Sequence, residues 1–128
     1  MTRKLFCWML CFGIVQCGLW GCSQSTPPLS DPAAAIRLVE AALKQWSEGS
    51  DWSELTQLAP PVYMSEDAWR EGWKLRQYTV DEAAVMVGTN VRVSVNLRCL
   101  DKYGKQRDMS IRYFVTTRPA QTIAREEK

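Results

Sequence analysis

The chain has 128 residues, with 16 Lys or Arg, 14 Asp or Glu and no histidine, so its formal net charge is +2. Because histidine is absent, catalysis by an Asp/His pair and metal sites with imidazole ligands are excluded. The near balance of charge argues against a nucleic-acid-binding protein, which concentrates basic side chains on one face. The chain contains no cofactor-binding motif, and we expect neither a cofactor nor a metal.

The first 22 residues have the three-part layout of a secretory signal. A short basic start is followed by an apolar run over residues 5–20, and the small Gly21 precedes Cys22. The run has 16 residues, fewer than the roughly 20 that a membrane-spanning helix needs. We therefore predict that residues 1–21 are a signal peptide, cleaved between Gly21 and Cys22.

Leu19-Trp20-Gly21-Cys22 resembles the lipobox of bacterial lipoproteins, with Trp20 in place of the small or β-branched residue usual there. The resemblance implies a diacylglycerol on the sulfur of Cys22 and often a further acyl chain, such as palmitate, on its new amine. Two or three acyl chains give stable attachment, whereas a single chain binds only marginally. The alternative is that Cys22 is an ordinary cysteine in a segment that holds three others.

After cleavage 107 residues remain, enough for one domain, which we place at residues 31–128 behind a polar spacer of residues 22–30. Ser23 after the acylated cysteine resembles the outer-membrane default of some bacteria. We therefore expect the cell envelope, with the outer membrane favoured over the inner one. Cys99 then has no cysteine left with which to form an intramolecular disulfide.

Helices are predicted in the first half of the domain. Asp31-Pro32 suits an N-cap followed by proline at the first helical position. An apolar stripe at three- and four-residue steps predicts an amphipathic helix from Ala33 to Glu48. The stripe consists of Ile36, Val39, Leu43 and Trp46. A short second helix around Leu55 and Leu58 must stop before Pro60.

A third short helix is predicted after Ser65-Glu66-Asp67, because these side chains suit the positive end of a helix. Trp69, Trp73 and Leu75 would form its buried stripe. The acids of this segment, like Asp81-Glu82, are predicted to be solvated surface groups, because adjacent side chains point apart.

From residue 78 onward the pattern alternates between apolar and polar side chains, which predicts strands. We expect one strand over residues 78–87 and a second over residues 91–99, the latter with one apolar face. A last short strand is expected at residues 121–125, followed by a frayed end at residues 126–128.

A type I turn at Asp101-Lys102-Tyr103-Gly104 predicts the register of the hairpin, with Asp101 opposite Lys105. The expected pairs are Leu97 with Met109, Val95 with Ile111, Val93 with Tyr113 and Val91 with Val115 on the apolar face, and Arg98 with Asp108 and Arg92 with Phe114 on the other.

Helices followed by strands predict an α+β fold, in which N-terminal helices pack on a curved antiparallel sheet. The helix over residues 33–48, the Gly49-Ser50-Asp51-Trp52 turn, the Trp69-x-x-Gly72-Trp73-x-Leu75 segment and the long hairpin resemble nuclear-transport-factor-2-like (cystatin-like) domains. That superfamily includes isomerases, dehydratases, polyketide cyclases and non-catalytic binding modules of bacterial envelopes. Its fold alone does not select a function.

The candidate pocket-lining residues are aromatic: Trp46, Trp69, Trp73 and Tyr113. Core packing is the alternative for the tryptophans. Cys99, on the apolar face of its strand, is predicted to be a small buried hydrophobe rather than a nucleophile.

Three functions stay open at this point. The first is a lipid-anchored envelope domain that contacts the membrane through its anchor and binds a protein partner or an apolar small ligand without chemistry. The second is an isomerase- or hydrolase-like enzyme, for which the resemblance implies a base such as Asp81 with Tyr63, Tyr78 or Tyr113 in the apolar cone between helix and sheet. The third is a structural subunit that forms a homodimer through its sheet.

Overall fold

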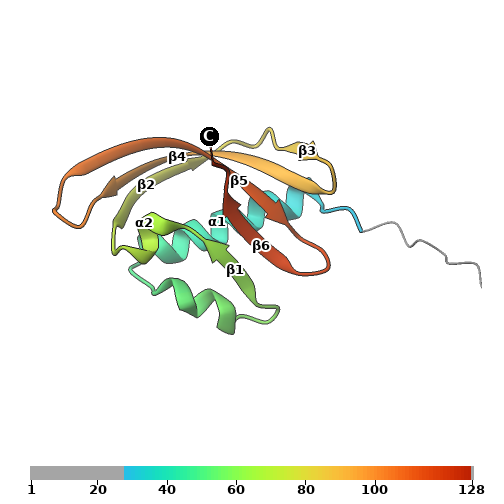
Figure 1. The fold of residues 1–128 in the computed structure, drawn as a ribbon, viewed down its shortest axis with the longest axis horizontal. Helices are drawn as coiled ribbons and strands as arrows, with labels where there is room; N and C mark the ends of the chain where they lie inside the picture. Colours follow the sequence, from blue (N-terminus) through green and yellow to red (C-terminus); the bar gives the residue numbers. More distant parts are fainter. Residues whose placement is uncertain (1–27, 128) are drawn as a thin grey trace, which may run out of the picture.

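The computed structural model describes residues 28–127. In chain order the elements are α1 (Pro32–Ser47), the 3-10 helix η1 (Trp52–Gln57), β1 (Val62–Ser65), α2 (Asp67–Arg70), β2 (Lys74–Val80), β3 (Val85–Val87), β4 (Asn90–Leu100), β5 (Gln106–Thr116) and β6 (Gln121–Arg125). The strands form one strongly curled sheet, and α1 lies in its concave side (Figure 1). The fold is therefore α+β with a half-barrel, mainly antiparallel sheet, as predicted at this level.

The strand order is β1-β6-β5-β4-β2, and β3 also pairs with β4. β1 runs parallel to β6, and the other described pairs are antiparallel. The single strand predicted over residues 78–87 is wrong, because the chain turns between β2 and β3. The carboxylate of Asp81 accepts a hydrogen bond from the N–H of Ala83 at 2.9 Å, which stabilises that turn.

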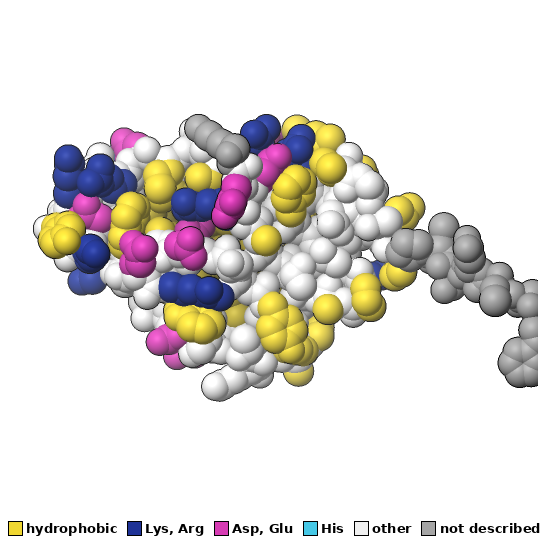
Figure 2. Space-filling model, viewed as in Figure 1, with side chains coloured by type: hydrophobic (Ala, Val, Ile, Leu, Met, Phe, Trp, Pro, Cys, Tyr) yellow, Lys and Arg dark blue, Asp and Glu magenta, His cyan; other side chains and the backbone are white. Residues whose placement is uncertain are grey.

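The β4–β5 hairpin has the predicted register. Leu97 pairs with Met109, Val95 with Ile111, Val93 with Tyr113, Val91 with Val115, Arg98 with Asp108 and Arg92 with Phe114. At the turn, the N–H of Asp101 donates to the Lys105 carbonyl at 2.9 Å, and the Asp101 carboxylate accepts the Tyr103 N–H at 2.9 Å. Figure 2 shows charged side chains of both signs gathered over the hairpin end of the domain.

The third predicted helix is shorter than expected. α2 ends at Arg70, and Gly72 has a φ of +87°, a left-handed conformation that glycine adopts at little cost and that does not continue a helix. Leu75 therefore lies in β2, opposite Cys99, instead of on a helical stripe. The N-cap is Glu66, whose carboxylate accepts the Ala68 N–H at 3.1 Å.

Both ends of the domain are more firmly held than predicted. Ser30 is buried, its N–H donates to the Thr89 carbonyl at 3.0 Å, and its hydroxyl accepts the Thr117 N–H at 3.0 Å. The folded part thus begins one residue earlier than predicted. Glu126 is not frayed, because its N–H donates to the Arg112 carbonyl at 2.8 Å and its carboxylate lies 3.1 Å from the Arg112 guanidinium.

The predicted signal peptide, the cleavage position after Gly21, the lipidation site Cys22 and most of the 22–30 spacer lie outside the described residues. Within residues 28–127, none of the helices combines the length and the apolar character that crossing a bilayer requires.

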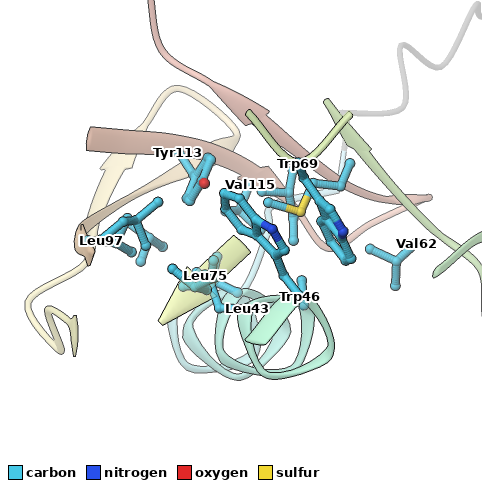
Figure 3. Packing of buried hydrophobic residues seen from close by; sticks show 14 of the residues in the cluster. Leu43, Trp46, Val62, Trp69, Leu75, Leu97, Tyr113 and Val115 are labelled. Carbon is cyan, nitrogen blue, oxygen red and sulfur yellow. The ribbon is translucent and has the colours of Figure 1, made fainter. Parts of the chain in front are cut away.

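The core fills the space between α1 and the concave face of the sheet (Figure 3). The predicted stripe of α1 is buried at Val39, Leu43 and Trp46, whereas Ile36 is partly buried. Alternating residues of β4, from Val91 to Cys99, face the helix and are buried as predicted. Full burial of a side chain such as Leu43 contributes about 1.5–3 kcal/mol. The cone between helix and sheet is thus closely packed around these side chains.

Candidate functional site

A surface groove of about 550 Å³ lies where the C-terminal end of α1 meets α2 and the start of β2. We call it the indole groove, because it contains the four tryptophans of residues 28–127. Its lining residues are Trp46, Ser47, Glu48, Gly49, Ser50, Asp51, Trp52, Trp69, Arg70, Gly72, Trp73, Lys74, Leu75 and Arg76. Three of the four predicted pocket-lining aromatics are therefore brought together here.

The floor of the groove is a stacked pair of indoles. The rings of Trp46 and Trp69 lie 5.6 Å apart between centroids, with 12° between their planes, and both side chains are buried (Figure 3). Trp46 Nε1 donates to the Trp73 carbonyl at 2.7 Å, and Trp69 Nε1 donates to the Ser50 carbonyl at 3.0 Å. Since both N–H groups are satisfied by backbone, these two tryptophans also belong to the core.

The rim of the groove combines an accessible aromatic ring with charges of both signs. Trp52 is 37% exposed, and the guanidinium of Arg70 lies 4.8 Å from the centroid of its ring, in cation–π geometry. Lys74 and Arg76 add positive charge, while Glu48 and Asp51 add negative charge. The groove thus offers both aromatic contact and ion pairing to whatever occupies it.

Two features of the rim are shaped by local hydrogen bonding. Asp51 caps η1, and hydrogen bonds from the N–H and hydroxyl of Ser53 lower the pKa of its carboxyl, so the carboxylate is ionised at neutral pH. Trp73 Nε1 is a buried donor with no hydrogen-bond acceptor among the described residues. A buried donor left without a partner costs free energy, so this atom is the least satisfied point of the groove.

Tyr113 does not line the groove. It is fully buried on β5, and its hydroxyl donates to Glu66 Oε2 at 2.6 Å. Arg125 Nη2 lies 2.7 Å from Glu66 Oε1, and the Ala68 N–H donates to the same oxygen at 3.1 Å. Glu66 is 1% exposed, so its predicted position on the solvated surface is wrong. A buried carboxylate is tolerated here because both oxygens are compensated by donors.

No local pattern in the sequence points to this buried cluster of Glu66, Tyr113 and Arg125. Tyr113 lies 47 residues and Arg125 lies 59 residues from Glu66 along the chain. Only the alternation of β5, which predicts Tyr113 on the inner face, could have suggested that its hydroxyl needs a buried partner.

Burial and the neighbouring Glu66 carboxylate raise the pKa of Tyr113 well above its usual range, so its side chain stays a neutral hydrogen-bond donor. Burial first, and Glu66 second, raise the pKa of the Cys99 thiol to about 11. A thiol with such a pKa is scarcely ionised at neutral pH and is a poor nucleophile. The prediction that Cys99 is a buried hydrophobe is confirmed.

The other residues considered for a catalytic role do not lie together in one site. Asp81 is exposed in the turn between β2 and β3, Tyr63 is exposed on β1, and Tyr78 is half-buried on β2. In the part of the chain that the structure covers, no three Cys, Asp or Glu side chains converge in a way that would hold a metal ion.

No protein-family model matches this chain, and neither the curated proteins nor the solved structures contain a match to it.

Proposed function

We propose that this protein is a lipid-anchored component of the bacterial cell envelope, whose domain binds a protein partner in the indole groove and performs no chemistry. The anchor is the acylated Cys22 that the lipobox-like Leu19-Trp20-Gly21-Cys22 implies. A cut before Cys22 would leave seven residues, 23–29, between the anchor and Ser30, where the folded domain begins.

The observation that carries the proposal is the position of the groove relative to Ser30. Ser30 lies against Thr89 and Thr117 at the N-terminal end of α1, whereas the groove lies at the C-terminal end of that helix. α1 has 16 residues and is therefore about 24 Å long. An anchor at Cys22 would hold the first end near the bilayer and leave the groove open to the surroundings (Figure 1).

The chemistry of the rim favours a polypeptide over a small apolar ligand. Trp and Arg are the residues that most often dominate the binding energy of protein interfaces, and Trp52 with Arg70 places both at an accessible point. The groove also carries charges of both signs: Lys74 and Arg76 are positive, and Glu48 and Asp51 are negative. An apolar ligand would leave these charges unpaired, while a partner segment with its own charges could satisfy them.

Within this proposal the domain is a member of the nuclear-transport-factor-2-like class. The support is the curled sheet with α1 in its concave side and the element order of one long helix, short helical segments and then the β4–β5 hairpin. In this chain the concave side is filled by packed side chains such as Leu43, Val93 and Tyr113. Binding is therefore assigned to the groove at the end of α1 rather than to the inside of the cone.

The enzyme alternative has one supporting feature, the buried carboxylate of Glu66 next to the Tyr113 hydroxyl. Both groups are inaccessible in this conformation, and both oxygens of Glu66 are already engaged by Tyr113, Arg125 and the Ala68 N–H. We therefore assign the cluster a structural role, which ties α2 to β5 and β6.

The outer face of the sheet gives little support to the alternative of a homodimer. That face carries ion pairs within one chain, between Arg98 and Asp108 at 3.0 Å and between Arg92 and Glu126 at 3.0 Å. A stable homodimer interface is more apolar than this. A mass in solution equal to two chains at micromolar concentration would instead favour the homodimer.

The anchor is tested with Cys22→Ala in the full chain. We expect this variant to keep its signal segment and to lack the mass of the acyl chains, whereas the original chain is processed and partitions into detergent. Normal processing and partitioning of Cys22→Ala would overturn the lipoprotein assignment.

The groove is tested by crosslinking in intact cells. A photoreactive residue replaces Arg76 at the rim, and a matched control places it at Glu82, which is exposed in the connection between β2 and β3, away from the groove. We expect a discrete crosslinked species from position 76 only, and its loss when Trp52→Ala and Arg70→Ala are added. The same species from both positions, or none from position 76, would contradict a binding role for the groove.

A further inference from the structure

Exposed apolar side chains gather at the end of the domain where the N-terminal chain joins it. Leu29 is 64% exposed, Val85 is 55% exposed and Met86 is 38% exposed. We call these three residues the N-terminal patch. Ser30, next to Leu29, donates its N–H to the carbonyl of Thr89 in the turn that follows β3, so the two parts of the patch lie at the same end. Figure 1 shows β3 and the N-terminal chain at that end.

The patch is not explained by packing within the chain. β3 pairs with β4 only over Asn90 to Arg92, and its side chains alternate between the two faces of the sheet. Met86 lies opposite the inward-facing Val91, and Val85 lies opposite Arg92 on the other face. Single exposed hydrophobes are normal on a protein surface. Here, however, the short strand β3 exposes one apolar side chain on each face, and Leu29 adds a third at the same end of the domain.

The length of chain between the patch and the proposed anchor indicates that the bilayer is what the patch contacts. This argument rests on the proposed acylation of Cys22. Seven residues, 23–29, separate Cys22 from Ser30. The eight steps from one Cα to the next span at most about 26–29 Å when the chain is fully extended. The patch is therefore held within about one domain diameter of the bilayer surface, so the apolar side chains at this end can reach it.

The charges at this end fit a contact that depends on apolar side chains rather than on attraction to anionic lipids. Asp81 and Glu82 lie in the connection that leads to β3, and Arg118 lies in the turn after Thr117. Figure 2 shows that, on the visible face, few charged side chains lie at the right-hand end, whereas charged side chains of both signs lie over the hairpin end and at the top. Arg92, which lies opposite Val85, is already paired with Glu126 at 3.0 Å. A polybasic surface, which would make binding sensitive to salt, is not present among residues 28–127 at this end.

We propose that Leu29 and the sheet edge formed by β3, with Val85 projecting on one side and Met86 on the other, make a membrane-contacting edge. This edge inserts into the interfacial region of the bilayer that holds Cys22 and so orients the indole groove away from the lipid. The contact works together with the acyl chains, which supply the attachment itself. Its role is to narrow the range of orientations that the spacer alone allows to the domain.

The test uses the full-length lipidated protein in vesicles of zwitterionic phospholipid. A polarity-sensitive fluorophore is attached at Val85→Cys, and the matched control carries it at Tyr103→Cys, which is 84% exposed in the β4–β5 turn. The buried Cys99 will not take up the label. We expect a blue shift and quenching by lipid-borne nitroxide at position 85, equal at low and high salt, and neither effect at position 103.

Several outcomes separate this inference from the proposed anchor. If the protein floats with the vesicles but position 85 is no more quenched than position 103, the anchor stands and the membrane-contacting edge is overturned. If the protein does not float with the vesicles at all, both fail. A blue shift at position 85 that appears without vesicles and grows with protein concentration would assign the patch to a second copy of the chain and overturn the membrane contact.

A second variant protects the test against a folding defect caused by the label. Val85→Asp with Met86→Asp changes two exposed side chains, so the far-ultraviolet circular dichroism should be unchanged. A fluorophore at Leu29→Cys in this background should lose its quenching by lipid-borne nitroxide, while flotation through Cys22 persists. Retained quenching at position 29 would count against the patch, since the acyl chains alone would then suffice.

Discussion

The hydroxyl oxygen of Tyr113 lies 2.6 Å from Oε2 of Glu66 in the interior of the domain. This hydrogen bond joins the middle of β5 to the residue that caps α2. Arg125, at the end of β6, completes the arrangement through a 2.7 Å contact with the other oxygen of Glu66. Three elements that are distant in sequence are thus held by one buried carboxylate.

Tyr113→Phe should destabilise the domain without changing its fold. The variant removes one donor and leaves Glu66 Oε2 buried with a single remaining contact, a hydrogen bond from Arg125 Nε at 3.3 Å. A hydrogen bond to a charged group is worth about 1.5–3 kcal/mol, and the free energy of unfolding in urea should fall by about that amount. Tyr63→Phe, at an exposed position, is the control and should change it by less than about 0.5 kcal/mol.

Buried and exposed ion pairs of this domain should differ sharply in how much they contribute to the free energy of unfolding. Glu66→Gln removes a charge that is almost fully buried and should cost about 3–5 kcal/mol, because the Arg125 charge is left uncompensated. Asp108→Asn breaks the exposed pair with Arg98 and should cost no more than about 1 kcal/mol. Equal losses of unfolding free energy in the two variants would show that burial adds nothing to the contribution of the Glu66–Arg125 pair.

The tryptophans of the indole groove should divide into core and rim residues according to how much their replacement lowers the free energy of unfolding. Trp46→Ala removes a buried indole from the stacked pair with Trp69 and should cost about 3–5 kcal/mol. Trp52→Ala removes an accessible ring and should cost about 1 kcal/mol or less. Partner crosslinking from the rim should nevertheless be lost with Trp52→Ala, and a large stability loss in that variant would contradict its assignment to the rim.

Stability should fall at alkaline pH. The Cys99 pKa is raised from 9.0 to about 11, so the unfolded chain releases this proton at lower pH than the folded one. The stabilising contribution is therefore fully present below pH 9 and is lost as the pH rises to about 11. Unfolding free energies measured across this range should fall less steeply in Cys99→Ala, although Tyr113, whose pKa is also raised, continues the loss above pH 10.

Gly72→Ala should destabilise the domain although nothing crowds the site. No atom lies within 4 Å of an added Cβ, but the φ of +87° costs a residue with a side chain about 1–2 kcal/mol. A midpoint of urea unfolding equal to that of the original chain would show that the backbone at residue 72 relaxes.

Local patterns in the sequence were enough to predict α1 and the β4–β5 hairpin. The apolar stripe of α1 repeats with the helical period, and the Asp101 turn sets every pair of the hairpin from Val91 with Val115 to Arg98 with Asp108. In both cases the interacting residues are close in sequence, so periodicity and turn chemistry contain the necessary information. The same is true of the α+β class.

The sequence also implies Cys22 as an acylation site, a prediction that concerns residues outside the described part of the chain. Within residues 28–127 it did not predict β1, whose four residues are too few to show a period and whose partner β6 lies 59 positions away, at Val62 and Gln121.

Only the tertiary structure decided where the functional surfaces lie. Trp52 and Trp73 line one groove because the end of α1, the start of η1, α2 and the start of β2 converge there. Glu66 is buried because Tyr113 and Arg125 reach it from distant strands. Such positions depend on contacts between residues that are far apart in the sequence. The side chains that compensate a buried charge or line a groove therefore cannot be identified from a short stretch of sequence.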